Sequence, residues 1–310
     1  MQTDSGALAG RTIRVSSIDD PRLDVYRNQK DAWLRAQRIG GTGLDTTLET
    51  PLGTGLFMAE GELVVRQLVR AVALGRGWRV RSVLISENRL GPMSQGEHAL
   101  SQLPPSVPIY LGDGDTLSAI VGFDLHRGVL VCGERPMPDQ AWSLDRLIAQ
   151  RRAIVVLEDL ANHDNMGGLF RNAGALIGAE HAGVLLSPRS CDPLYRKALR
   201  VSIGQALHVP HAVAGDWPGD LERLANAGFE TLALTPAPDA VDIDEIEPIG
   251  PTDHDRRLAI VLGAEGPGLT NAAMDACQRR VRIPVRLEAD SLNVATAGAI
   301  AMHRLWSLRG

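Results

Sequence analysis

The chain has 310 residues, of which 44% are hydrophobic and 22% charged, with a formal net charge of -5. This length favours two domains of ordinary size with a substantial apolar core. The acidic balance argues against binding nucleic acid through overall positive charge, although a local basic cluster can still do so. The sequence contains no apolar run long enough to cross a bilayer and does not begin like a signal peptide, so we expect a cytoplasmic protein with no membrane partner.

The three cysteines, Cys132, Cys191 and Cys277, lie far apart in the sequence and have no metal-ligand spacing. We expect them to be reduced and to act as small apolar side chains, with no metal site.

Strands and helices alternate in the first half of the chain. A segment near 20–38 is predicted to be helical, and residues 53–86 to form strand, helix and strand. That helix is predicted to begin near Ala59 and end before Gly75. Its apolar spacing selects Leu63, Val64, Leu68, Val72 and Leu74. A strand at 107–112, a helix near 115–120 and a strand at 127–133 complete this half.

The segment near 20–38 is also rich in basic residues: Arg22, Arg27, Lys30, Arg35 and Arg38. Two interpretations stay open. These residues form a basic face for a nucleic acid, or they form a solvated face balanced by Asp24 and Asp31.

The second half repeats the alternation after a proline-containing stretch, 134–142, and a helix at 143–151. Domains are therefore predicted at 1–148 and 149–310. Strands are expected at 153–159, 181–187, 205–210, 230–235, 256–263 and 279–285. Helices are expected at 166–177, 193–199, 217–227, near 270–277 and from Ser291, with a loop over 236–255. This pattern predicts an α/β fold with a mainly parallel sheet covered on both faces.

The stretch HDNMGGLFRNAGALIG, residues 163–178, follows an apolar strand. Its spacing matches neither a P-loop nor a dinucleotide-binding fingerprint. Gly167 and Gly168 suggest a tight turn before a helix whose N-terminus could hold an anion or a ribose. Arg171 would then lie near that N-terminus, where a cation is unfavourable for the helix dipole. Such a conflict is typical of functional sites, although an ordinary surface arginine is the simpler alternative.

Two later stretches have similar features. IVLGAEGPGL, 260–269, ends an apolar strand in a glycine-rich loop that carries Glu265. VRIPVRLEADSLNV, 281–294, leads from a strand to a helix for which Ser291 is the expected N-cap. Asn293 is polar in an otherwise apolar setting.

Together these three stretches closely resemble the motifs of the SpoU/TrmH family of RNA 2′-O-ribose methyltransferases, which belong to the knotted SPOUT class. The resemblance covers 165–310 in the same order, and RVSIG at 200–204 is similar to a further family segment. The first half resembles, more loosely, a smaller N-terminal α/β ribosomal-protein-like substrate-binding domain. One departure is clear: His163 and Asp164 stand where the family has Asp-Pro, so the rigidity of the loop is in question.

The resemblance implies a C-terminal trefoil-knotted parallel-sheet domain, S-adenosyl-L-methionine as cofactor, RNA as partner and a homodimer. It further implies that Thr235, Gly263, Ile283 and Leu292 contact the cofactor. Arg171 would be the catalytic arginine, with Asn165, Glu265, Ser291 and Asn293 completing the site.

The implied reaction is attack of a ribose 2′-oxygen on a sulfonium methyl group of the cofactor, in rRNA or tRNA. Because a guanidinium stays protonated, we interpret Arg171 as a clamp for the RNA phosphate and the developing alkoxide. Two alternatives are a catalytically silent RNA-binding or assembly protein and an ordinary nucleotide enzyme, which the missing glycine fingerprint disfavours.

Overall fold

The computed structural model describes residues 8, 10–27, 55–125, 127–137, 139–250, 253, 255–286 and 292–306. The chain forms two compact units. The first contains Met1–Ala141 together with Leu194–Leu207, and the second contains Trp142–Pro193 and His208–Gly310.

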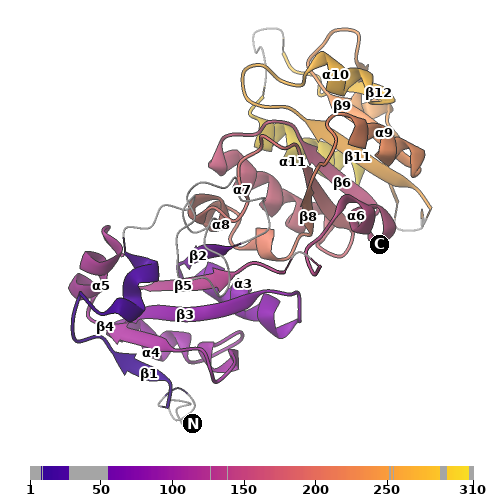
Figure 1. Ribbon diagram of the computed structural model, residues 1–310. Helices are drawn as coiled ribbons and strands as arrows, with labels where there is room; N and C mark the ends of the chain where they lie inside the picture. The colour runs from indigo at the N-terminus through magenta and orange to yellow at the C-terminus, as the bar shows by residue number, and fades with distance from the viewer. Residues whose placement is uncertain are drawn as a thin grey trace. The chain divides into compact units, whose positions relative to one another are not determined.

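The first unit is built on a five-stranded sheet with the order β1-β4-β3-β5-β2 (Figure 1). β1, β4 and β3 run parallel, while β5 is antiparallel to its neighbours β3 and β2. The strands are β1 (Thr12–Arg14), β2 (Leu56–Glu60), β3 (Arg79–Ser86), β4 (Ile109–Gly112) and β5 (Val129–Glu134). The helical segments are η1 (Pro21–Tyr26), α3 (Glu62–Ala73), α4 (Glu87–Met93), η2 (Leu100–Gln102), α5 (Gly114–Val121), α8 (Arg196–Val201) and η4 (Gln205–Leu207). The predicted alternation of strands and helices is thus confirmed.

One expectation for this unit needs correction, and another can be checked only in part. Helix α3 buries Val64, Val65, Leu68, Val69 and Ala71, whereas Leu63 and Leu74 are 58% and 55% exposed. The expected apolar face was therefore displaced around the helix. Of the predicted basic helix only a 3-10 turn, η1, is described. There Arg22 pairs with Asp20, and Arg27 pairs with Asp24. Lys30, Arg35 and Arg38 lie outside the described residues.

The segment Leu194–Leu207 belongs to the first unit although it lies far along the sequence. The Arg200 guanidinium pairs with the buried Glu60 carboxylate of β2 at 2.8 Å. The Trp78 indole donates a hydrogen bond to the Leu207 carbonyl at 2.9 Å. The RVSIG segment thus packs within the first unit. Recognition of RNA by this unit stays a prediction, as does a division at 148/149.

The second unit is built on a seven-stranded sheet with the order β10-β12-β9-β11-β6-β7-β8, and its described strand pairs are all parallel (Figure 1). The strands are β6 (Ala153–Leu157), β7 (Ala182–Leu186), β8 (His211–Val213), β9 (Phe229–Leu234), β10 (Val241–Asp242), β11 (Arg257–Leu262) and β12 (Arg279–Arg282). The helical segments are α6 (Leu144–Gln150), α7 (His163–Asn172), η3 (Ala173–Ile177), α9 (Gly219–Asn226), η5 (Ile243–Glu245), α10 (Asn271–Asp275) and α11 (Val294–Leu305).

Helices cover both faces of this sheet, as the alternation predicted. Apolar side chains of α6, α9 and α10 pack with Ile154 and Val156 of β6 in one core cluster. Helices α7 and α11 pack together on the opposite face. Because both faces are covered, the central strands are continuous apolar runs.

One predicted strand is wrong. Residues 205–210 contain the 3-10 turn η4 and then lead to Pro210, and β8 begins only at His211. Proline has no amide hydrogen to donate to a strand ladder, so the pairing with β7 starts after it. The expected loop over 236–255 also contains the short strand β10, which extends the sheet beside β12.

Candidate functional site

A cleft opens at the carboxyl ends of three neighbouring strands of the second unit. β9, β11 and β12 are adjacent and parallel, so the loops that leave them meet at one edge of the sheet. This edge is where open α/β sheets bind ligands. The cleft has a volume of about 640 Å³, which is typical of small-molecule sites. Its walls include Leu234, Thr235, Gly263, Met274, Ile283 and Leu292.

All four residues predicted to contact a cofactor line this cleft. Thr235, Gly263 and Ile283 lie just after β9, β11 and β12, and Leu292 lies just before α11. The Thr235 amide donates to the Val281 carbonyl at 2.9 Å, which fixes the end of β9 against β12. The structure therefore brings the four residues together, while their contact with a cofactor stays a prediction. The apolar walls Leu234 and Met274 were not singled out from the sequence.

The loop after β11 folds back on itself. The Gly268 amide donates to the Ala264 carbonyl at 3.0 Å. A side chain on Gly263 would place its Cβ 2.2 Å from the Gly268 carbonyl carbon. Gly266 and Gly268 adopt positive φ angles of 86° and 70°, which glycine alone adopts readily. The glycines therefore shape one wall of the cleft and leave Glu265 exposed.

One polar residue from each of the three motifs joins a single hydrogen-bonded cluster. The Asn165 amide group donates to Oε1 of Glu265. Nδ2 of Asn293 donates to the same oxygen at 3.2 Å and to Oδ1 of Asn165 at 3.0 Å. Asn165 is only 5% exposed. We name these three residues the amide–carboxylate cluster. Two of them, Glu265 and Asn293, line the cleft.

Helix α7 begins earlier than expected, which corrects the predicted glycine turn. The side chain of Asn162 caps the helix by accepting from the Asp164 amide at 2.8 Å and the Asn165 amide at 3.2 Å. His163 and Asp164 therefore form the first helical turn. Asn162 was missed, although an Asn before a predicted helix is a recognised capping signal. The cap fixes the start of α7 without the proline that the resemblance led us to expect.

Gly167 and Gly168 consequently lie inside α7 and not in a turn. A Cβ on Gly168 would lie 3.1 Å from the Cβ of Ala295 on α11. On the facing helix, a Cβ on Gly298 would lie 2.4 Å from Leu169. The small residues let α7 and α11 approach closely.

Arg171 has a different place from the one expected. It lies in the last turn of α7, which continues directly into η3, so it is remote from the helix N-terminus and the predicted electrostatic conflict is wrong. Arg171 is exposed and does not line the cleft. Among the described residues it has no hydrogen-bond or ion-pair partner. The structure thus leaves its guanidinium available but separate from the amide–carboxylate cluster.

Ser291 lies outside the described residues, so its predicted role in the site is not placed. The expectation that it caps the last helix is wrong. Helix α11 begins at Val294, and its N-cap is Asn293, whose Oδ1 accepts from the Ala295 amide at 3.0 Å and the Thr296 amide at 3.2 Å. Asn293 thus uses its oxygen to cap α11 and its nitrogen to hold the cluster.

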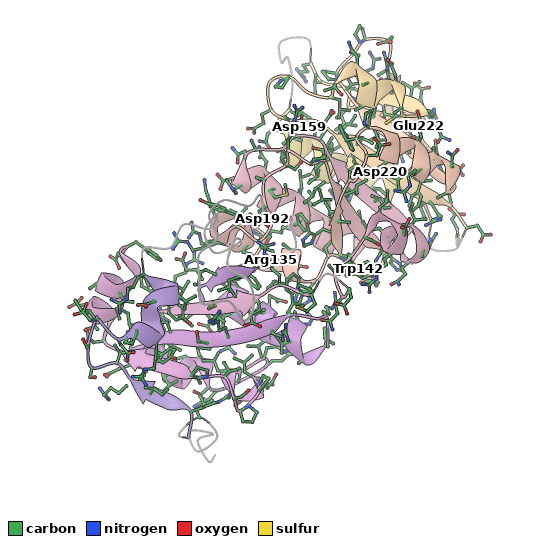
Figure 2. The ribbon with its side chains drawn as sticks, viewed as in Figure 1. Arg135, Trp142, Asp159, Asp192, Asp220 and Glu222 are labelled. Carbon is green, nitrogen blue, oxygen red and sulfur yellow. The ribbon has the colours of Figure 1, made fainter. Side chains whose placement is uncertain are left out.

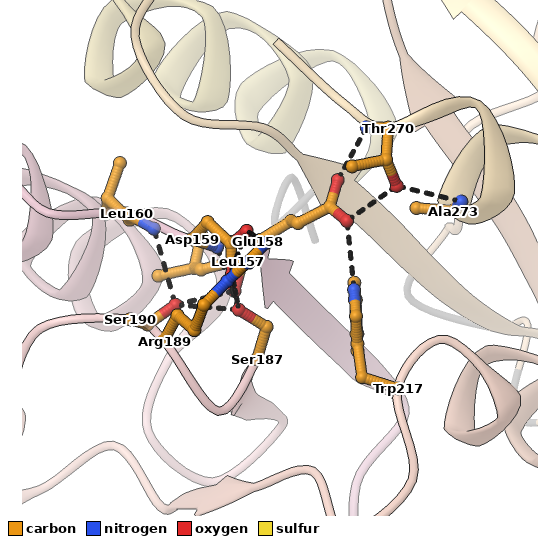
Figure 3. A network of polar contacts seen from close by, with 10 residues as sticks. All are labelled: Leu157, Glu158, Asp159, Leu160, Ser187, Arg189, Ser190, Trp217, Thr270 and Ala273. Atoms are coloured by element: carbon orange, nitrogen blue, oxygen red, sulfur yellow. Dashed lines mark hydrogen bonds and ion pairs between the residues drawn. The ribbon is translucent and has the colours of Figure 1, made fainter. Parts of the chain in front are cut away.

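A buried acidic residue that sequence reasoning missed supports the base of the cleft loop. Glu158 follows β6 and is 1% exposed. Its carboxylate accepts hydrogen bonds from the Trp217 indole at 2.9 Å and from the amide and hydroxyl of Thr270, both at 2.8 Å (Figure 3). Thr270 follows the glycine loop after Leu269 and caps α10. An acid at the end of an apolar strand was the available signal.

Two other acids of this unit have structural partners. Asp159, labelled in Figure 2, has an unusual φ of 51° and pairs with Arg189. The Arg189 guanidinium, through its hydrogen bonds, lowers the pKa of the Asp159 carboxyl. Asp220 is fully buried and accepts from the Gly215 amide at 2.8 Å and from Arg223 at 2.8 Å. Neither acid lines the cleft.

Other expected chemistry can be checked only over the described part of the chain. There, no cluster of three His, Cys, Asp or Glu side chains is suited to hold a metal ion, and no helix has the length and apolarity to cross a membrane. The three cysteines are unpaired, and burial raises the pKa of each thiol to about 12.

Comparison with known proteins places this site in a family. The profile of the SpoU rRNA methylase family matches residues 152–303. An uncharacterized tRNA/rRNA methyltransferase of Mycobacterium bovis is 37% identical over 290 residues, which cover 93% of this chain and 90% of that protein.

Solved structures show a similar fold over nearly the whole chain. The AdoMet-bound rRNA methyltransferase from Sinorhizobium meliloti has a TM-score of 0.68 at 22% identity, with 96% of this chain and 98% of that one covered. A structure of an RNA 2′-O ribose methyltransferase has a TM-score of 0.64 at 22% identity, with 94% and 98% covered. With three motifs brought to one cleft, a family profile that matches residues 152–303 and a relative 37% identical over 93% of this chain, the chain belongs to the SpoU/TrmH family of RNA methyltransferases.

Proposed function

We propose that this protein transfers a methyl group from S-adenosyl-L-methionine to a ribose 2′-hydroxyl of rRNA or tRNA. The observation that carries the proposal is the convergence of three distant motifs. Asn165, Glu265 and Asn293 join in one hydrogen-bonded cluster at the mouth of the cleft. The sulfonium of S-adenosylmethionine supplies an electrophilic methyl group when the cofactor is bound.

The cleft suits this cofactor in size and chemistry. Its volume of about 640 Å³ is in the range for small molecules. Gly263 leaves no room for a Cβ, so the backbone itself forms the wall on which a flat base can lie. Backbone groups at the ends of β11 and β12 and before α11 provide donors and acceptors for adenine and ribose. We assign cofactor binding to Thr235, Gly263, Ile283 and Leu292.

The chain's main contribution to the reaction is alignment and charge. Holding an oxygen in line with a reactive carbon removes much of an entropic barrier. The cluster fixes the Glu265 side chain at the cleft mouth, where the 2′-hydroxyl would lie. We assign the RNA phosphate and the developing negative charge to Arg171, because its guanidinium can donate two parallel hydrogen bonds.

We further propose a homodimer working in the cytoplasm, where rRNA and tRNA are available. Support for the dimer comes from the place of Arg171. It is exposed on α7 and does not line the cleft of its own chain within the described residues. A second copy related by twofold symmetry could bring its Arg171 to this cleft.

The test of the activity is methylation of total RNA from a strain that lacks this protein, with methyl-labelled S-adenosylmethionine. The expected product is RNA in which the label is on the 2′-oxygen of one nucleotide type, resistant to alkaline cleavage at that site. Absence of transfer to any RNA would overturn the proposal. Cofactor binding by calorimetry without transfer would instead indicate a catalytically silent RNA-binding protein.

A complementation assay tests the placement of Arg171. Arg171→Ala and Gly263→Ala chains, each inactive alone, are mixed and allowed to exchange subunits. If Arg171 serves the cleft of the partner copy, mixed dimers contain one intact site and about a quarter of full activity returns. If both residues serve the site of the same chain, each site of the mixed dimer carries one of the two substitutions, so no site is intact and no activity returns.

Arg171→Lys tests whether the two parallel hydrogen-bond donors of the guanidinium matter for the reaction. The substitution keeps the charge but loses the paired donors. We expect methyl transfer to fall at least about 10-fold, since the parallel hydrogen bonds are lost. Full activity of Arg171→Lys would contradict a role for the paired donors of Arg171.

A further inference from the structure

The amide–carboxylate cluster holds one oxygen of Glu265 and leaves the other free. Oε1 accepts from both Asn165 and Asn293. Oε2 accepts no hydrogen bond from the part of the chain that the structure describes. The side chain is exposed and lines the cleft. A carboxylate that is fixed through one oxygen beside an open cleft, and whose second oxygen accepts no such bond, is suited to accept a proton.

The remaining lining residues offer no competing base. Among the described residues that line the cleft, Glu265 is the only titratable side chain, since the others are apolar, glycine, proline, Thr235, Asn271 and Asn293. Threonine and asparagine do not accept a proton at neutral pH, and an arginine guanidinium stays protonated. Arg171 does not line the cleft.

We propose that Glu265 is the general base of the reaction. This inference rests on the proposed methyl transfer to a ribose 2′-hydroxyl. The 2′-O–H bond breaks, and its proton passes to Oε2 of Glu265. The 2′-oxygen forms a bond to the methyl carbon as the carbon–sulfur bond breaks, and the bonding pair goes to sulfur. The products are the 2′-O-methyl ribose, a neutral thioether and a protonated Glu265, which then returns its proton to water.

The two asparagines have a defined part in this step. Their amide groups donate to Oε1, so they fix the carboxylate beside the cleft, leave Oε2 available and act as positioning residues. Asn165 is buried and Asn293 is fixed as the cap of α11. A catalytic group held by packed elements keeps its geometry better than a free loop side chain.

The decisive variant is Glu265→Gln, in which the amide oxygen can still accept from both asparagines. Single-turnover methyl transfer is followed with total RNA from the strain lacking this protein, between pH 6 and pH 9. We expect the rate at pH 7 to fall about 100- to 10,000-fold, the usual contribution of a general base. S-adenosylmethionine affinity by calorimetry and RNA affinity by filter binding should stay within about 3-fold, because the step that fails follows binding.

The pH profile separates a base from a merely structural residue. If a side-chain base takes the proton, the wild-type rate should stay nearly constant from about pH 7 to pH 9. The Glu265→Gln rate should rise about tenfold per pH unit, because hydroxide then replaces the missing base. Control variants are Glu288→Gln and Asp290→Asn, two carboxylates of the sequence that precedes α11, which should stay near the wild-type rate.

Two results would overturn this role for Glu265. One is a Glu265→Gln rate within 3-fold of wild type with an unchanged pH profile. The other is a low rate that rises steeply with pH in Glu288→Gln or Asp290→Asn, while Glu265→Gln keeps the flat wild-type profile. If the wild-type protein itself transfers no methyl group, the result overturns the proposed function. The two failures are therefore distinguished by the activity of the wild-type protein.

Discussion

Two glycine-containing segments of the second unit look alike in sequence but adopt different backbone structures. Each follows a buried strand, β6 or β11. In the first, Gly167 and Gly168 lie within α7, and Gly168 faces α11. In the second, Gly263 to Gly268 form an irregular loop with positive φ angles that walls the cleft. Glycine thus marks close approach in both, between helices in one case and at a ligand site in the other.

The deciding difference is the residue that precedes each segment. Asn162 caps α7, so the helix begins at His163, before Gly167 and Gly168 in the sequence. No such cap precedes Gly263, and the loop instead closes through the bond between Gly268 and Ala264. A glycine run therefore predicts close packing, and the capping residue decides whether the backbone around it is helical.

The largest expected effect is that of Gly263→Ala. The new Cβ would lie within 2.4 Å of backbone atoms of Gly268 and Leu269, so the loop must move. We expect S-adenosylmethionine affinity to fall at least about 100-fold, since a shift of this wall removes contacts worth about 3 kcal/mol. Calorimetry measures it. The control is Gly215→Ala, where a Cβ meets nothing within 4 Å; equal losses in both variants would show a general defect.

Gly298→Ala tests the close packing of α11 against the helical segment α7. Its Cβ would lie 2.4 Å from Leu169. Overpacking of this kind costs about 1–3 kcal/mol, so the unfolding midpoint in urea should fall. Gly168→Ala is the matched variant, because its Cβ meets only Ala295 at 3.1 Å and alanine favours a helix by about 1 kcal/mol. A larger loss for Gly168→Ala than for Gly298→Ala would contradict the packing described.

Asn162→Ala removes the N-cap that makes the first of the two segments helical. Loss of an N-cap costs about 1 kcal/mol of stability. Because the cap also fixes the amide of Asn165, methyl transfer should fall as well. Asp113→Ala removes the comparable cap of α5 in the first unit and should lower stability without changing cofactor affinity. Unchanged methyl transfer in Asn162→Ala would show that the cap does not contribute to the geometry of the site.

The smallest effect concerns Asp159, at the end of β6. Its pKa is lowered chiefly by the hydrogen bonds from Arg189. The pair therefore stabilises the fold above the ordinary carboxyl pKa of about 4, and the contribution is lost as pH falls through the lowered value. Since the Arg189 side chain is 77% exposed, we expect at most about 1 kcal/mol. Asp159→Asn, which tolerates the positive φ, should be less stable than wild type in urea unfolding at pH 7, and the difference should narrow as pH falls below about 4.

The sequence made the sheet and the cleft predictable because both depend on local signals. Apolar runs predicted the central strands, and the strand ends at Thr235, Gly263 and Ile283 meet because parallel neighbours end at one edge. The resemblance to known motifs supplied Asn165, Glu265 and Asn293, and the structure brings these three together.

What could not be predicted depends on contacts between distant residues. Leu194–Leu207 joins the first unit through pairs such as Arg200 with Glu60, which no local pattern reveals. Glu158 is informative only once Trp217 and Thr270 are seen around it. The place of Arg171 followed from where α7 begins, and that was misjudged because the Asn162 cap was overlooked.

The most direct test of the account is calorimetric titration of S-adenosylmethionine into three proteins: wild type, Gly263→Ala and Gly168→Ala. The account predicts one site per chain in wild type and in Gly168→Ala with closely similar affinity, and no measurable binding to Gly263→Ala. Equal binding by Gly263→Ala, or no binding by wild type, would contradict the assignment of this cleft to the cofactor.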